Sequence, residues 1–317
     1  CICFQFSVSF VEMHHSSLRY TRALWSAAQL CICVAIMLFS ACGEAPTTQP
    51  TVPGLITDGI SSSGAIMLQG NVVMIPPPAI LSHAISRQNI DFEKQSVSDP
   101  NHPEKWTGEM KKALNLGVLG ADLSYLINHN QGALIPRYLA AIRQLTDNLG
   151  ISHEVDPELL QQIEAGLENP SNMLGLQGVF FRNLESYLHK NKRDAISTYI
   201  LLGGWIEALH QLSNPADSIA GHPLDRLLVE QTHSARGVRS LLDSLQTESF
   251  APIGASILEL CDALEDLEKT YEFKSPIHDK REAVTYVRSN ASVVYSESEL
   301  HELHELIRET RQLILAP

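Results

Sequence analysis

Residues 113–127 read ALNLGVLGADLSYLI, and residues 195–209 read AISTYILLGGWIEAL. Both segments are apolar on almost every side of a helix, which is typical of helices buried at the centre of a domain. Each also holds small residues, Gly117 in the first segment and the pair Gly203-Gly204 in the second. Glycine inside a helix costs about 1 kcal/mol relative to alanine, and a close helix crossing is the usual compensation. We therefore expect two central helices that are crossed closely by their neighbours.

Outward from these segments, apolar spacing, prolines at helix starts and glycines or Asn-Pro pairs at helix ends predict more helices. The predicted helices, central ones included, cover about 79–87, 103–128, 133–149, 157–169, 171–190, 193–212, 223–245 with a break near Gly237, 252–269 and 297–314. Ser296 and Glu299 form a capping box for the last helix. Only Val72–Ile75, Val284–Val287 and Ser292–Tyr295 indicate strands.

The sequence therefore predicts an all-α fold. We expect a multi-helix antiparallel bundle or an irregular helical array over residues 76–317, because short connections make successive helices antiparallel neighbours. No repeat of a fixed period supports a solenoid. Hydrophobic residues make up 44% of the 317 residues and charged residues 19%, which is enough for a large core.

The net charge of the chain is −13, and it becomes −14 beyond residue 41 because the first 41 residues carry only Glu12, Arg19 and Arg22. An acidic surface of this size argues against nucleic acid as a partner, and against electrostatic attraction to anionic lipid.

The N-terminal region has the three parts of a secretory signal. Residues 1–12 precede the first methionine, so we expect them to be an upstream extension and Met13 to be the start. Arg19 and Arg22 lie in a short charged segment, and residues 23–39 are almost wholly apolar. Small residues follow at the expected cleavage point. We assign the signal peptide to residues 13–41.

The sequence Phe39-Ser40-Ala41-Cys42-Gly43 resembles the lipobox of bacterial lipoproteins. The resemblance implies that Cys42 becomes the acylated N-terminus, anchored in the lipid bilayer through palmitate-like chains, and Gly43 rather than Asp implies the outer membrane. Residues 42–75, rich in Pro, Thr, Gly and Ser, then form a tether that faces the periplasm. The alternative is an uncleaved transmembrane anchor, but the apolar run of about 17 residues lies at the lower limit for spanning a bilayer.

A second resemblance covers roughly residues 75–215. Ile75-Pro76-Pro77-Pro78, the segment Ala113–Tyr125, Leu149-Gly150-Ile151 and Gly203–Glu207 are similar to a group of all-helical lipoproteins of Bacteroidetes type that has no assigned activity. The resemblance implies the compartment and the helical fold, and it implies no chemistry.

Asp122 and Glu207 are the most informative carboxylates, because each lies in one of the two apolar helices. A buried carboxylate is costly unless it is paired or hydrogen-bonded. The two could face each other and bind a cation or do acid–base work, with Tyr125 and Trp205 lining the same possible ligand pocket. The alternative is a purely structural role, in which each caps a helix or pairs with an arginine such as Arg137 or Arg182.

Other chemical signals are weak. His301 and His304 are three residues apart, unlike the zincin arrangement, and they fit a charged, solvated helix face better than a metal site. Cys261 lies on an apolar stripe and is expected to be a buried hydrophobe. Sequence motifs for phosphate, dinucleotide, calcium or hydrolase sites are absent from the chain. We assign no catalytic residue, no metal ligand and no cofactor.

These observations predict a membrane-anchored lipoprotein whose helical domain binds a partner, with an envelope protein as one candidate, or a ligand. The alternative is a small-molecule or metal-binding protein, or a weakly marked enzyme, with a polar pocket around Asp122 and Glu207.

Overall fold

The computed structural model describes residues 65–68, 71–88, 90–152, 161–162, 170–213, 223–243, 245, 250–279, 284–286 and 290–317. The described residues all belong to one unit, Thr57–Pro317. The predicted signal peptide, Cys42 and most of the tether lie outside the described residues, as does the predicted 157–169 helix apart from residues 161–162. None of the helices within the described part of the chain is both long and apolar enough to cross a membrane.

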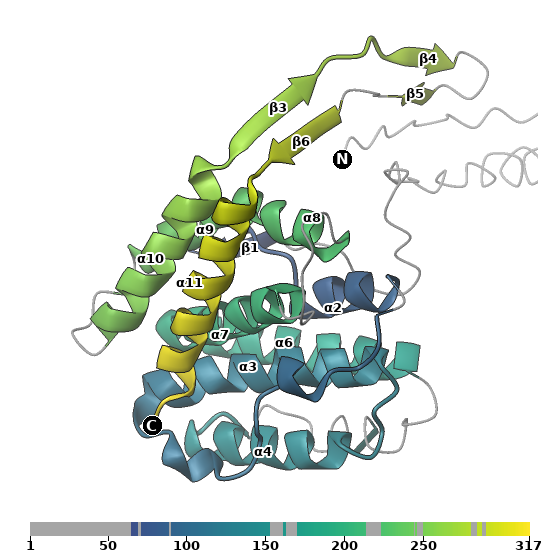
Figure 1. Cartoon of the computed structure of the whole chain (residues 1–317). Helices are drawn as coiled ribbons and strands as arrows, with labels where there is room; N and C mark the ends of the chain where they lie inside the picture. The colour runs from purple at the N-terminus through teal and green to yellow at the C-terminus, as the bar shows by residue number, and fades with distance from the viewer. Residues whose placement is uncertain are drawn as a thin grey trace, which may run out of the picture. The chain divides into compact units, whose positions relative to one another are not determined.

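The described chain is mainly helical, which confirms the all-α prediction (Figure 1). Its helices are α2 Pro78–Ser86, α3 Gly108–Asn128, α4 Ile135–Asn148, α6 Pro170–Lys190, α7 Asp194–Ser213, α8 Pro223–Val229, α9 Thr232–Leu242, α10 Ala251–Asp266 and α11 Glu297–Leu315. Short 3-10 turns, η1 Lys94–Ser96 and η2 Pro103–Lys105, lie in the segment before α3.

Two predicted boundaries are wrong. Pro103 opens only the η2 turn, and α3 itself begins at Gly108, where φ is +75°. The break predicted near Gly237 lies instead at residues 230–231, between α8 and α9. The capping box predicted for the last helix is confirmed, because the Ser296 side chain accepts from the Glu299 backbone and the Glu299 side chain accepts from the Ser296 backbone.

Helices α3 and α7 form the centre of the domain, as predicted. Every residue from Ala113 to Ile127 is buried. A Cβ added to Gly117 would overlap the Ile200 carbonyl oxygen, and one added to Gly203 would overlap the Leu114 carbonyl oxygen. The glycines therefore allow the two backbones to touch. Glu109 pairs with Arg193 at the start of the two helices, and Asp122 accepts from Gln211 toward their ends, so α3 and α7 run parallel although they are not neighbours in sequence.

The C-terminal end of α11 is held by side chains near the start of α3. Trp106 Nε1 donates to Leu315 O over 3.0 Å, Lys111 Nζ donates to Leu313 O over 2.6 Å, and Asn115 Nδ2 donates to Ile314 O over 3.0 Å. The last carbonyls of a helix lack partners within the helix, and a cation there also interacts favourably with the helix dipole. This arrangement ties the end of the chain to the central helix.

Strands occur only as antiparallel pairs in the described residues. Ala65–Leu68 (β1) pairs with Asn71–Met74 (β2), within the segment expected to be tether. Between α10 and α11, Glu268–Glu272 (β3) pairs with Asn290–Val294 (β6), and Ile277–Asp279 (β4) pairs with Val284–Tyr286 (β5). We call these last four strands the β-ribbon; Figure 1 shows it continuing from the ends of α10 and α11. Strands β5 and β6 were predicted, whereas β3 was wrongly assigned in part to a helix.

Candidate functional site

Asp122 lies on α3 and is fully buried. Its Oδ2 accepts two hydrogen bonds from Ser98, one from the backbone N over 3.0 Å and one from Oγ over 2.5 Å. Tyr138 on α4 donates its hydroxyl to Ser98 O over 2.6 Å. Gln211 on α7 donates to Asp122 Oδ1 over 3.3 Å. Asp122 therefore joins the segment before α3 to two helices.

Glu207 lies on α7, and its side chain is also fully buried. Arg311, from α11, donates Nε to Oε2 over 2.6 Å and a terminal guanidinium nitrogen to Oε1 over 2.7 Å. Such a two-bond contact uses the planar geometry of both groups and is a strong form of ion pair. The Arg311 side chain is 14% exposed, so even the cation is largely removed from water.

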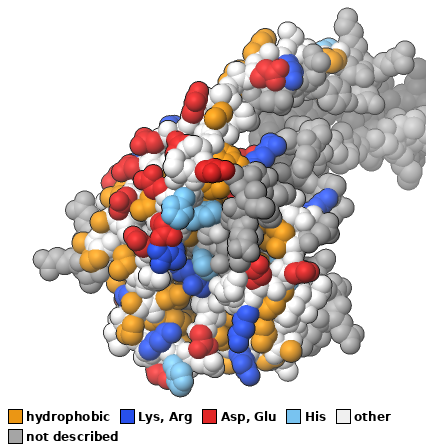
Figure 2. Space-filling view, in the orientation of Figure 1, with side chains coloured by type: hydrophobic (Ala, Val, Ile, Leu, Met, Phe, Trp, Pro, Cys, Tyr) orange, Lys and Arg blue, Asp and Glu red, His pale blue; other side chains and the backbone are white. Residues whose placement is uncertain are grey.

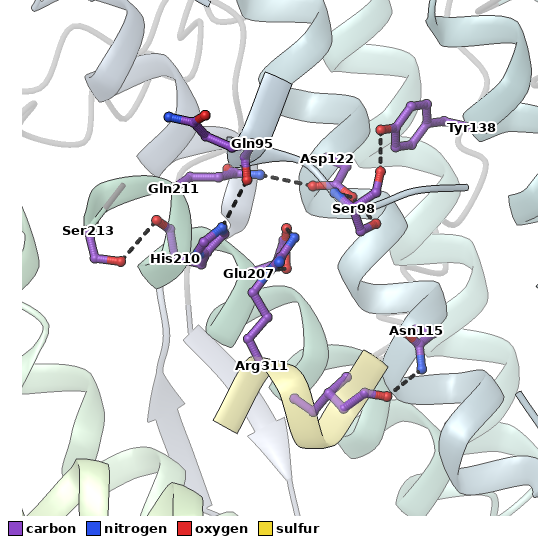
Figure 3. A network of polar contacts seen from close by, with 11 residues as sticks. Gln95, Ser98, Asn115, Asp122, Tyr138, Glu207, His210, Gln211, Ser213 and Arg311 are labelled. Carbon is purple, nitrogen blue, oxygen red and sulfur yellow. Dashed lines mark hydrogen bonds and ion pairs between the residues drawn. The ribbon is translucent and has the colours of Figure 1, made fainter. Parts of the chain in front are cut away.

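The two carboxyl groups are brought together, and they share a hydrogen bond. Burial, the neighbouring Glu207 charge and this hydrogen bond hold the pKa of Asp122 well above its ordinary value. The pKa of Glu207 is lowered despite its burial, because Arg311 lies against it. The arrangement therefore favours the neutral form of Asp122 and the ionised form of Glu207, whose charge the Arg311 guanidinium balances. Figure 3 shows these side chains converging from α3, α7 and α11.

A half-buried histidine borders this network. His210, on α7, donates its Nε2 proton to Gln95 O over 3.2 Å, because a carbonyl oxygen can only accept. Burial lowers the pKa of His210, and the attraction of Glu207 opposes that effect. Ser213 Oγ donates to His210 O over 3.0 Å, so the polar contacts continue to the end of α7 (Figure 3).

The two aromatic residues proposed for the same pocket have other described surroundings. The Tyr125 ring stacks on His129, with centroids 4.0 Å apart, and it also contacts Phe92. Trp205 is fully buried in α7, and its Nε1 has no hydrogen-bond partner within the described part of the chain. No contact that the structure describes joins either ring to Asp122 or Glu207.

The arginines suggested as ion partners are wrong. Arg137 and Arg182 are both exposed, and Arg311 fills that role. The position of Arg311 in the sequence indicates this role. Arg311 follows Ile307 by four residues and precedes Ile314 by three, so it occupies a position on the apolar stripe of the last helix. A charged residue on such a stripe needs a buried partner.

The remaining candidates show no assembled site. His301 is exposed, whereas His304 is partly buried with its Nε2 unpartnered among the described residues. Among the residues that the structure describes, no three His, Cys, Asp or Glu side chains group as metal ligands would. Cys261 is fully buried, as predicted, and burial raises the pKa of its thiol to about 12.

Exposed apolar side chains concentrate on the β-ribbon. Six large hydrophobic residues are exposed in the described chain, and five of them lie in or beside its strands: Tyr271, Phe273, Ile277, Val284 and Val294. The helical surface is different: Figure 2 shows acidic side chains gathered over the side where α10 and α11 lie.

Comparisons with known proteins give no relative. No protein-family model, no curated protein sequence and no solved structure matches the chain.

In chemical terms, the Asp122–Glu207–Arg311 network places a carboxyl group of raised pKa beside one of lowered pKa. Neither carboxyl group is exposed, and their oxygen atoms already have partners in Ser98, Gln211 and Arg311. Buried ion pairs of this kind often have a structural role. A substrate or cation could reach the carboxylates only if the helices moved apart.

Proposed function

We propose that this chain is a lipoprotein of the cell envelope, anchored through acylated Cys42 in the outer membrane and facing the periplasm. We further propose that its helical domain is a binding module, not an enzyme. The observation that carries the second proposal is the β-ribbon, where five of the six exposed large hydrophobic residues of the described chain lie. Exposed apolar patches commonly mark sites of interaction.

The polar network supports the same proposal, because its carboxyl groups already have a structural role. The two buried carboxyl groups with altered pKa values are occupied in holding α3, α7 and α11 together. The β-ribbon contributes little to the core beyond its base, where Val293 packs against the helices. A two-stranded ribbon is only marginally stable without further contacts, so a partner surface would stabilise it.

The anchor can be tested by replacing Cys42 with Ser and fractionating the cells. We expect the native protein in the membrane fraction, labelled by a palmitate analogue, and the C42S variant unlabelled and released from the membrane. A C42S variant that stays in the membrane at native levels would contradict the anchor.

A second candidate function is favoured by one observation, the contact between Asp122 and Glu207. Two carboxyls beside one guanidinium could accept a small cation when both are ionised. Metal analysis of the purified protein, with Asp122→Asn as the comparison, tests this alternative. A stoichiometric ion that the variant loses would support it over the binding module.

A further inference from the structure

The two faces of strand β3 differ in chemistry. Side chains alternate along a strand, so Lys269 and Tyr271 share one face, and the acidic residues Glu268 and Glu272 share the other. Phe273 continues the alternation of Lys269 and Tyr271 directly beyond the strand. We call the face that carries Lys269, Tyr271 and Phe273 the aromatic face.

The side chains of the aromatic face are exposed to solvent beyond the ends of the helices. Tyr271 is 67% exposed and Phe273 is 69% exposed. At the base of the ribbon, Val293 pairs with Lys269 and packs against the helical core. The same face is thus covered by helices at one end and open beyond it. Lys269 is exposed at this boundary, with its ammonium group donating to Glu265 O over 2.9 Å.

The charges of the ribbon limit what can approach each face. Glu268 and Glu272 are exposed and would be repelled by an anionic surface. The aromatic face of β3 carries no acidic residue, and its one charge is positive. Tyrosine and phenylalanine beside lysine suit the interface between lipid headgroups and acyl chains, where aromatic rings are enriched and lysine reaches phosphate.

We propose that the aromatic face of the β-ribbon rests on the headgroup layer of the membrane that holds the lipid anchor. The proposal rests on the proposed function, because the anchor supplies the proximity. Between Cys42 and β1 lie residues 43–64, which span at most ~75 Å when fully extended. A domain held within that distance meets the bilayer at high effective concentration, so a weak contact is sufficient.

The experiment compares labels on adjacent residues that point to opposite faces. Tyr271→Cys and Thr270→Cys are each introduced into the lipidated full-length protein and labelled with an environment-sensitive fluorophore. Cys261 does not interfere because it is buried, and Cys42 is acylated. The proteins are reconstituted into vesicles of phosphatidylcholine with phosphatidylglycerol, and quenching by lipid-borne and aqueous quenchers is measured.

We expect the label at position 271 to be quenched mainly from the lipid and the label at position 270 mainly from water. In the Tyr271→Cys background, Phe273→Ser should reduce the lipid quenching. Lys269→Gln should weaken the contact about fivefold in vesicles with phosphatidylglycerol and hardly at all in phosphatidylcholine alone. Circular dichroism of each variant establishes that the helices are intact.

Three outcomes would overturn the membrane contact while leaving the anchor in place. The two labels could be quenched alike on vesicles that the protein still floats with. The label at 271 could be shielded without vesicles as protein concentration rises, which would indicate a second copy, or only after envelope proteins are added, which would indicate a protein partner. If the native protein does not float with vesicles at all, the anchor itself is wrong, and this proposal fails with it.

Discussion

Arg311 binds both carboxylate oxygens of Glu207, 104 residues earlier in the chain, at 2.6 and 2.7 Å. The contact fixes the last helix against the central pair, and Asp122, which lies against Glu207, extends it to α3. Three helices that are far apart in sequence are therefore joined by one buried group of charged and polar side chains.

Replacing Arg311 with Met should destabilise the protein by about 3–5 kcal/mol near neutral pH, because Glu207 would be left as a buried charge without its partner. The loss should shrink as the pH falls, since a protonated Glu207 no longer needs a cation. Urea unfolding followed by circular dichroism measures both effects. Arg308→Met, on the exposed side of the same helix, should change the stability little, because water screens its ion pair with Glu305. Equal losses for the two variants would refute the role of the network.

The pKa of Asp122 gives stability a specific pH dependence. Because that pKa is raised in the folded state, the folded protein binds the proton more tightly than the unfolded chain. The stabilisation is complete below the unfolded pKa of about 3.8 and is lost as the pH rises toward the folded value. Asp122→Asn, which copies the protonated carboxyl, should remove this decline. Unfolding free energies measured from about pH 2 to about pH 9, the range where carboxyl and histidine groups titrate, test the prediction.

Glu207 contributes with the opposite sign. Its pKa is lowered, so its stabilisation is present above the unfolded value of 4.5 and is lost as the pH falls through the folded value. The native protein should therefore be less stable at both ends of the range, and Asp122→Asn should flatten only the alkaline side. An unchanged alkaline decline in Asp122→Asn would show that other groups cause it.

Gly117→Ala should destabilise the protein by at least about 1–3 kcal/mol, because the new methyl group would overlap the Ile200 carbonyl and push α3 away from α7. Gly175→Ala, in the helix α6, is the matched control. A Cβ at Gly175 meets nothing within 4 Å, so alanine should stabilise the helix by up to about 1 kcal/mol. Thermal unfolding of the two variants should shift in opposite directions.

Cys261 should be unreactive in the folded protein. Burial raises the pKa of its thiol to about 12, so the reactive thiolate is scarce near neutral pH and the reagent has no access. A thiol reagent such as dithiobis-nitrobenzoate should label the native mature protein only at the rate of unfolding, and should label it fully in urea. Rapid labelling of the native protein would contradict the packing of α10.

The helical fold and most helix positions could be predicted from the sequence, because apolar spacing, proline starts and the Ser296–Glu299 capping box are local signals. The close crossing at Gly117 and Gly203 could also be predicted, since glycine weakens an apolar helix and is compensated when a neighbouring backbone comes close. Strand β3 was missed for a physical reason. All five of its residues are exposed, so the apolar–polar alternation that indicates a strand is absent.

Which residues meet was settled by the packing of the helices. Asp122 and Glu207 were recognisable in the sequence as costly buried charges. Nothing in the sequence, however, indicates that Ser98 donates two hydrogen bonds to Asp122. Arg311 could have been noticed on its apolar stripe, yet its partner depends on how α11 packs across α3 and α7. Local sequence preferences fix helices one at a time, whereas a buried ion pair forms only after separate helices have packed together.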